Sequence, residues 1–170
     1  MGWSYSLPLK DILFSGHTTC MRTIYRDIVG GFIFSRDGKL LLGKNRKGGV
    51  YEGCYVVPGG GVEAGETNEQ ALQREMKEET GIAIVGAKIT AMGTSTGEHQ
   101  KTLAETEEVV NVKMTFHDFR IDLGQDAATV TLTTEDDWHE AEWFLVSELD
   151  ELKLSQPTCK RLIAMGLVNL

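Results

Sequence analysis

Short apolar runs, separated by polar or glycine-containing segments, dominate the first third of the chain. The run at Arg26–Ser35 predicts a buried strand. The dipeptide Asp37-Gly38 is typical of a hairpin turn, so Leu40–Leu42 is predicted to be the returning strand. Tyr55–Val57 then predicts a short strand that leads into a glycine-rich loop.

A helix is predicted directly after this loop. Thr67 and Gln70 have the spacing of a capping box, in which Thr67 is the N-cap. Gly81 supplies the left-handed residue that commonly ends a helix. The segment between Thr67 and Gly81 is therefore predicted to be helical.

The pattern after this helix predicts further strands. Ile82–Ile89 is predicted to be a strand with Met92 as its furthest end, and Val109–Ile121 a long strand. Between them, Gly97–Glu107 is polar and charged, which predicts a mobile loop near the functional site. Gly124–Thr134 has a mixed pattern of loop and weak strand. The residues expected to face the core from the long strand are Val110, Val112, Met114, Phe116 and Phe119.

The last part of the chain is predicted to contain one strand and two helices. Trp143–Val146 predicts the strand, and Ser147 is predicted to be the N-cap of a short helix. Gln156–Met165 predicts an amphipathic helix. Its inward-facing residues are expected to be Leu162, Ile163 and Met165. Because strands outnumber helices and the helices come late and separately, the predicted fold class is α+β, with a mixed β-sheet between helical layers.

Length and composition limit the kind of protein this is. The 170 residues fit one domain, and weak periodicity at the start predicts an N-terminal extension over 1–22 and a single domain over 23–170. The net charge of −8 argues against a nucleic-acid-binding surface, which is normally basic. Cys20, Cys54 and Cys159 are odd in number without a close pair, and no apolar run has membrane-spanning length. These features predict a cytoplasmic protein with no nucleic-acid or membrane partner.

Three carboxylates on the predicted helix suggest a chemistry. Glu75, Glu78 and Glu79 are three and four residues apart, so they project from one face of the helix and repel one another. A hard divalent cation such as Mg²⁺ or Mn²⁺ prefers oxygen ligands and would relieve that repulsion. The preceding glycines provide a backbone that can closely approach a phosphate or a metal. The segment therefore predicts metal-assisted chemistry on phosphates.

The loop and helix together resemble the signature of a known family. Five residues separate Gly60 from Glu66, and seven more lead to Arg74–Ile82. These spacings are similar to the Nudix box at every defining position, so the chain contains a complete box over Gly60–Ile82. The approach Val57–Gly60 is also similar to that of the family. On these residues the chain is identified as a member of the Nudix hydrolase family, the MutT-like proteins.

The resemblance implies a fold and an activity. Nudix domains are α/β/α sandwiches in which the box loop and helix lie beside a mixed central sheet. The resemblance implies metal-dependent hydrolysis of a phosphoanhydride bond in a nucleoside diphosphate derivative: a nucleoside triphosphate, a nucleotide sugar or a dinucleotide. Mg²⁺ or Mn²⁺ is the implied cofactor, a small nucleotide the implied partner, and a homodimer the implied assembly, since many relatives are dimers.

The resemblance also assigns roles within the box. Arg74 is expected to orient the carboxylates, and Glu66 to support the loop and the start of the helix. Glu78 is counted with Arg74 and Glu66 among the catalytic residues. The residues that match the family's metal ligands are Gly59 (through its carbonyl), Glu75, Glu78 and Glu79.

Two groups outside the box are candidates for completing the site. Family members differ in where the general base lies, and here the later loop is residues 135–140. Within it Glu140 or Asp137 would complete a metal site or activate water, unless the segment is a solvated acidic turn. The other group is basic and would meet substrate phosphates, unless it is a solvated strand end. It comprises Lys44, Arg46 and Lys47.

Two other functions are compatible with parts of the sequence. His139 lies four residues before Trp143, which resembles the base position of GDP-mannose mannosyl hydrolases, Nudix enzymes that attack sugar carbon. That branch typically has a degraded box, so the complete box favours attack at phosphorus. A non-catalytic nucleotide sensor is the third reading, but such a protein is expected to have lost one or more box glutamates.

Overall fold

A mixed β-sheet with helices on both of its faces makes up the protein. The computed structural model describes residues 21–45, 51–133 and 138–169, with the side chain of His139 excepted. The strands are β1 (Thr23–Phe34), β2 (Lys39–Asn45), β3 (Tyr55–Val56), β4 (Gly59–Gly61), β5 (Lys88–Thr102), β6 (Val109–Asp122) and β7 (Trp138–Leu145). The helices are α1 (Asn68–Thr80) and α2 (Gln156–Ala164), with 3₁₀ turns η1 (Ala127–Thr129) and η2 (Val146–Glu151).

The sheet is ordered β3-β2-β1-β6-β5, with β4 paired to β1 and β7 paired to β2. The central strands β1 and β6 run parallel, in register from Thr23 opposite Asn111 to Phe34 opposite Asp122. The other pairings, β1 with β2 and β4, β2 with β3 and β7, and β5 with β6, are antiparallel. The predicted mixed sheet is therefore confirmed.

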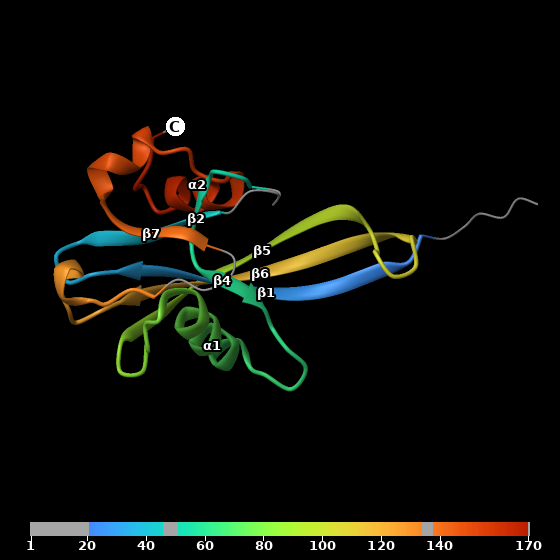
Figure 1. Ribbon diagram of the computed structural model, residues 1–170, viewed down its shortest axis with the longest axis horizontal. Helices are drawn as coiled ribbons and strands as arrows, with labels where there is room; N and C mark the ends of the chain where they lie inside the picture. The colour runs from blue at the N-terminus through green and yellow to red at the C-terminus, as the bar shows by residue number, and fades with distance from the viewer. Residues whose placement is uncertain (1–20, 46–50, 134–137, 170) are drawn as a thin grey trace, which may run out of the picture.

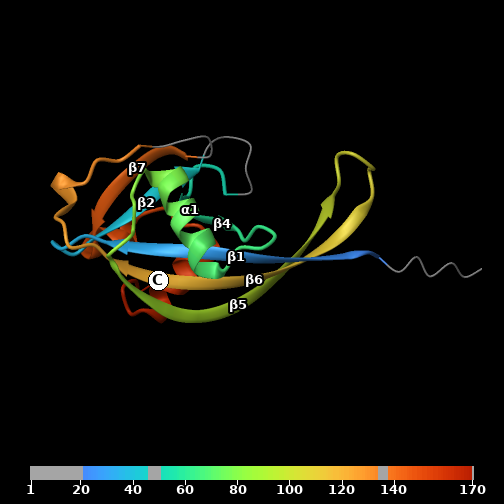
Figure 2. The ribbon, with the colours of Figure 1, turned by 90° about the horizontal axis from the view of Figure 1, so that it is seen from below.

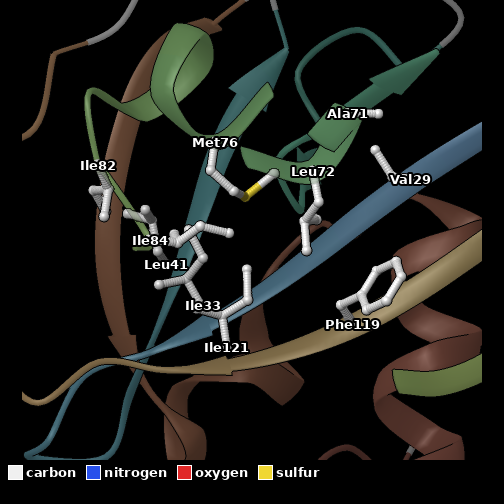
Figure 3. Packing of buried hydrophobic residues seen from close by; sticks show 10 residues of the cluster. All are labelled: Val29, Ile33, Leu41, Ala71, Leu72, Met76, Ile82, Ile84, Phe119 and Ile121. Atoms are coloured by element: carbon white, nitrogen blue, oxygen red, sulfur yellow. The ribbon is translucent and has the colours of Figure 1, made fainter. Parts of the chain in front are cut away.

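One face of the sheet packs against α1. Because successive strand residues point to opposite faces, Val29 and Ile33 of β1 project to the same side. There they meet Leu72 and Met76 of α1, all four side chains being fully buried (Figure 3). The cluster is completed by Leu41, Ala71, Ile82, Ile84, Phe119 and Ile121.

The opposite face packs against η2 and α2. The alternate residues Phe32 and Phe34 of β1 lie here, with Leu149 of η2 and Leu162 of α2. Leu40, Leu42 and Val168 complete this second cluster. Figure 1 shows α1 on one side of the sheet and η2 with α2 on the other, so the predicted α/β/α sandwich is confirmed.

The sheet is longer than its helical layers. The hairpin formed by β5 and β6, together with the first half of β1, projects well beyond both helices (Figures 1 and 2). Strand β4 lies near the point where this arm leaves the sandwich (Figure 1). None of the helices in the described part of the chain has the length and apolar character needed to cross a membrane.

The structure corrects the prediction for the segment after α1. Ile82 and Ile84 are buried, but they anchor a loop, and the strand begins only at Lys88. The predicted mobile loop Gly97–Glu107 is wrong for its first half, because β5 continues to Thr102 and pairs with β6, whereas residues 103–107 do form a turn. Its polar sequence reflects an exposed edge strand, and the hairpin turn lies at the far end of the arm (Figure 1).

Three details near the C-terminus also differ. Strand β7 begins at Trp138, so the predicted loop 135–140 ends earlier than expected, and residues 134–137 lie outside the described residues. Leu145, not Ser147, precedes the first residue of η2. Ile163 is exposed, whereas Leu162 is buried as predicted.

The predicted extension 1–22 is described only at residues 21 and 22.

Candidate functional site

The glycine-rich segment is a short strand, not the predicted loop. Gly59 and Gly60 of β4 pair with Gly30 and Val29 of β1. A Cβ atom on Gly59 would lie 2.1 Å from the Val29 carbonyl oxygen, so only glycine permits this backbone contact. The sequence therefore brings this strand against the centre of the sheet.

Helix α1 begins and ends as its sequence predicts. The Thr67 hydroxyl accepts a hydrogen bond from the Gln70 N–H at 3.2 Å, and the Gln70 side chain accepts from the Thr67 N–H at 2.9 Å. Gly81 follows the last turn with φ +75°, the left-handed conformation. Burial of Leu72 and Met76 fixes the rotation of the helix about its axis.

Arg74 ties the helix to the segment before it. Its Nε donates to Glu66 Oε1 at 2.8 Å and its Nη2 to Glu66 Oε2 at 2.9 Å, a bidentate pair. Nη2 also donates to the Gly61 carbonyl at 2.9 Å. Hydrogen bonds from Arg74, and then from the Glu63 N–H, lower the pKa of Glu66 to about 2. Glu66 is therefore bonded both to the helix and to the segment before it, and its supporting role stays a prediction.

The same guanidinium contacts two of the box glutamates. Arg74 Nη1 donates to Glu75 Oε1 at 2.7 Å and to Glu78 Oε2 at 3.2 Å. The hydrogen bond to Glu66 is the largest of several effects that raise the pKa of Arg74. One cation therefore lies among three carboxylates, which leaves the cluster with excess negative charge.

The box glutamates also reach β4. Glu79 Oε2 accepts a hydrogen bond from the Gly59 N–H at 2.7 Å. A Cβ atom on Gly60 would lie 2.4 Å from the carboxyl carbon of Glu75, so that carboxylate lies directly against the glycine backbone. Exposure differs along the helix: the Glu75 side chain is 12% exposed and the Glu78 side chain 57%. The helix therefore presents one covered and one accessible carboxylate beside β4.

These donors suit the predicted metal, although they are not gathered around a common centre. Across residues 21–45, 51–133 and 138–169, no three His, Cys, Asp or Glu side chains form a ready-made ion site. Glu75 and Glu78 are paired with Arg74, and Glu79 with Gly59. All are carboxylate oxygens, the donor type that Mg²⁺ and Mn²⁺ prefer, so the donor set fits the ion. Assignment of Gly59, Glu75, Glu78 and Glu79 as ligands stays a prediction.

The candidates outside the box are only partly described. Glu140 lies on β7 opposite Lys44 of β2, and their charged groups are 3.8 Å apart. Lys44 Nζ also lies 5.7 Å from the ring centre of Tyr55. Arg46 and Lys47 lie outside the described residues, as does the side chain of His139, whose backbone belongs to β7. The proposed roles of these residues remain predictions.

Sequence reasoning missed a second charged group near β4. Asp118 of β6 lies opposite Gly30 of β1 and is only 8% exposed. Arg161 Nε, on α2, is 2.5 Å from Asp118 Oδ2, and Arg161 Nη2 donates to the hydroxyl of Ser95 on β5. The one local sign of this pair in the sequence is an acidic residue, Asp118, within a strand that also contains apolar residues. That sign does not indicate Arg161, which lies far away in the sequence.

Sequence comparisons identify known relatives. The model of the NUDIX domain matches residues 24–164. Nucleoside triphosphatase NudI of Escherichia fergusonii is 31% identical over 139 residues, which cover 80% of this chain and 94% of that protein. ADP-ribose pyrophosphatase of Methanocaldococcus jannaschii is 54% identical over 50 residues, but these span only 29% of this chain and 29% of that protein.

Solved structures share the fold. The dihydroneopterin triphosphate pyrophosphohydrolase of E. coli has a TM-score of 0.62 at 19% identity, covering 85% of this chain and 97% of that one. The NUDIX domain of Shewanella oneidensis NrtR, complexed with ADP ribose, has a TM-score of 0.61 at 15% identity, covering 84% of this chain and 86% of that one. At such identities the likeness concerns the fold alone.

Proposed function

The chain belongs to the NUDIX domain family, and from that premise we propose that it is a pyrophosphohydrolase that cleaves a phosphoanhydride bond of a nucleotide with the help of a divalent cation. We place the reaction at the glutamates of α1 that lie against β4. A nucleoside triphosphate is the first substrate to test, because a relative that is matched over 94% of its own length is named a nucleoside triphosphatase. ADP-ribose and nucleotide sugars are the next candidates.

The cation would be held by oxygens of Glu75, Glu78 and Glu79, with the Gly59 carbonyl as a backbone ligand. When bound, such an ion polarises phosphoryl oxygens and lowers the pKa of a water molecule. Because Arg74 already occupies oxygens of Glu75 and Glu78, it keeps these like charges together before any ion arrives. Glu66 and the Gly61 carbonyl hold Arg74 in turn.

This proposal rests on the hydrogen bonds made by the guanidinium group of Arg74. Arg74 joins Glu66, the Gly61 carbonyl, Glu75 and Glu78. A solvated acidic helix would not need its carboxylates fixed against a glycine strand. Phosphoryl transfer depends chiefly on positioning and charge neutralisation, which a fixed cluster of this kind supplies.

The test is product analysis on a panel of nucleoside triphosphates, ADP-ribose and nucleotide sugars with Mg²⁺. We expect nucleoside monophosphate and a phosphorylated second product from at least one substrate. Chelator should abolish the reaction, and Glu78→Gln should lower kcat at least about a hundredfold. Glu69→Gln, which changes an exposed glutamate in the first turn of the same helix, is the matched control and should retain wild-type kcat. Activity that survives in excess chelator would overturn the proposal.

A further inference from the structure

A buried ion pair connects α2 to the middle of the sheet. Asp118 of β6 and Arg161 of α2 are 2.5 Å apart at Oδ2 and Nε, and the arginine also donates to Ser95 of β5. The Asp118 side chain is only 10% exposed, whereas that of Arg161 is 26% exposed. Burial raises the pKa of Asp118, with the opposing effect of Arg161 second in size.

Apolar packing also attaches α2 to the sheet. Leu162 of α2 is fully buried and already packs into the cluster formed by Phe32, Phe34 and Leu149. Buried ion pairs seldom add stability over apolar side chains of similar size, because both charges must be removed from water. The pair therefore has a more specific explanation than helix attachment.

Its position links it to the proposed active site. Gly30 lies between Asp118 on one side and Gly59 on the other, in register with both. A Cβ atom on Gly30 would be 3.1 Å from Asp118 Oδ1, so the missing side chain leaves this oxygen beside bare backbone. The Asp118 carboxylate is thus one strand away from the β4 glycine that contacts Glu79.

An apolar surface lies next to the pair on the same face of the sheet. Ile28 and Phe116 are the register pair adjacent to Gly30 and Asp118 on that face. Phe116 also lies close to Gly97 of β5, where an added Cβ atom would approach its ring to 3.2 Å. Farther along the arm, a hollow of about 330 Å³ continues this surface. It is lined by Ile24, Arg26, Ile28, His99, Val112 and Met114, among others.

Resting on the proposed function, we propose that Asp118 and Arg161 bind the edge of the substrate's nucleobase, with Ile28 and Phe116 forming the apolar surface beneath its ring. A carboxylate next to a guanidinium presents a hydrogen-bond acceptor beside donors. A nucleobase edge presents the complementary arrangement, an N–H group beside a ring nitrogen or carbonyl oxygen. An apolar surface with a few convergent polar groups is the usual construction of a small-molecule site.

The chemistry predicts selectivity among bases. Asp118→Asn replaces one acceptor oxygen with an amide donor, so it reverses part of the pattern while keeping the side-chain shape. Asp122→Asn is the matched control: Asp122 lies on the same face of β6 and pairs with Arg120 Nη2 at 2.8 Å, four residues from the proposed site. Only the first substitution should change which base is preferred.

The experiment measures dissociation constants of GMP, AMP, CMP and UMP by calorimetry without metal, and kcat/KM for the four triphosphates with Mg²⁺. We expect Asp118→Asn to change the ratio between the best and the worst base by about tenfold, through the dissociation constant and KM more than through kcat. Asp122→Asn should leave both ratios as in the wild type. Equal affinity of the wild type for all four bases, or an unchanged ratio in Asp118→Asn, would overturn the inference.

A second variant distinguishes a change in base binding from a loss of folding. Asp118→Asn combined with Arg161→Met removes both charges, so no buried charge is left without its partner. It should melt near the wild-type temperature and bind the four monophosphates with similar constants. If this double variant kept the wild-type preference among the four bases, the ion pair would have only a structural role and the inference would fail. Selective binding by a wild type that hydrolyses none of the triphosphates, ADP-ribose or nucleotide sugars would refute the proposed function alone.

Discussion

Substitution of Gly60 provides a direct test of the contact between β4 and the first box glutamate. Gly60 is not in the left-handed conformation, so alanine is compatible with its backbone. The new Cβ atom would lie 2.4 Å from the Glu75 carboxyl carbon, whereas ordinary contact begins at 3.4 Å. The carboxylate must therefore move by about 1 Å, and a displacement of about that size can lower a catalysed rate about a hundredfold.

The fold should tolerate this change. The atom that must move is the end of a flexible side chain, and an altered rotamer costs about 0.5–1.5 kcal/mol. Replacement of glycine by alanine at a compatible position stabilises a protein by about 0.4–1 kcal/mol through the unfolded state. Gly60→Ala should therefore unfold in urea close to the wild type, while kcat/KM with Mg²⁺ falls about a hundredfold, or about 2.7 kcal/mol.

Gly61→Ala is the matched control. Its Cβ atom would lie 3.5 Å from Arg26 Nη2, an ordinary contact, so both stability and kcat/KM should stay near wild type. In a Glu75→Gln background, Gly60→Ala should cause little further loss, because both changes act on one carboxylate. If Gly60→Ala kept wild-type kcat/KM, or if Gly60→Ala and Gly61→Ala lowered it equally, the close contact of Gly60 with Glu75 would not matter for catalysis.

Other contacts of α1 and of the segment before it can be tested separately. The pKa of Glu66 is about 2 in the folded protein against an ordinary 4.5, so its stabilisation is complete above pH 4.5 and lost as pH falls toward 2. In Glu66→Gln, the free energy of unfolding measured in urea should change less with pH between 4.5 and 2 than in the wild type. An equal change with pH in both proteins would contradict the pairing with Arg74. Mg²⁺ should raise the melting temperature of the wild type more than that of Glu79→Gln, and equal shifts would place the ion elsewhere. Met76→Ala, at a fully buried position, should lower the free energy of unfolding by about 2–5 kcal/mol in urea titrations, and a loss below about 1 kcal/mol would contradict the packing of α1.

Local signals in the sequence were enough to place α1. A capping box at Thr67 and a left-handed glycine at Gly81 depend only on residues within the helix and its ends, and both occur as predicted. The spacing of Glu75, Glu78 and Glu79 also predicted that these side chains project from one face, since helix geometry fixes that relation. What the spacing could not supply was the partner of each carboxylate.

Strands with few apolar residues were harder to predict. Strand β5 contains Thr, Ser, Gly and charged residues, so its sequence has little alternation of apolar and polar positions. It is a strand because β6 pairs with it along its length, and this long-range pairing outweighs weak local preference. The glycines of β4 are likewise predicted to form a loop, and pairing with β1 makes them a strand.

Tertiary packing also places the ring of Trp138 against β2. The ring of Trp138 occupies the space that a side chain at Gly43 would fill, since a Cβ atom there would lie 2.0 Å from it. The glycine on β2 and the tryptophan on β7 are far apart in sequence, so neither predicts the other. Asp118 and Arg161 are a second example, because their pairing depends on how α2 lies across the sheet.

In the proposed reaction water attacks phosphorus at the box glutamates, and hydrolysis of a nucleotide sugar in ¹⁸O-labelled water with Mg²⁺ shows which atom the water attacks. Mass spectrometry of the products should find the label in a phosphate group, with a nucleoside monophosphate and a sugar phosphate released. His139→Ala should give the same products at a similar rate, whereas Glu78→Gln should give almost none. Label on the sugar carbon, with release of a nucleoside diphosphate and loss of activity in His139→Ala, would instead show attack at the sugar and contradict the proposed reaction.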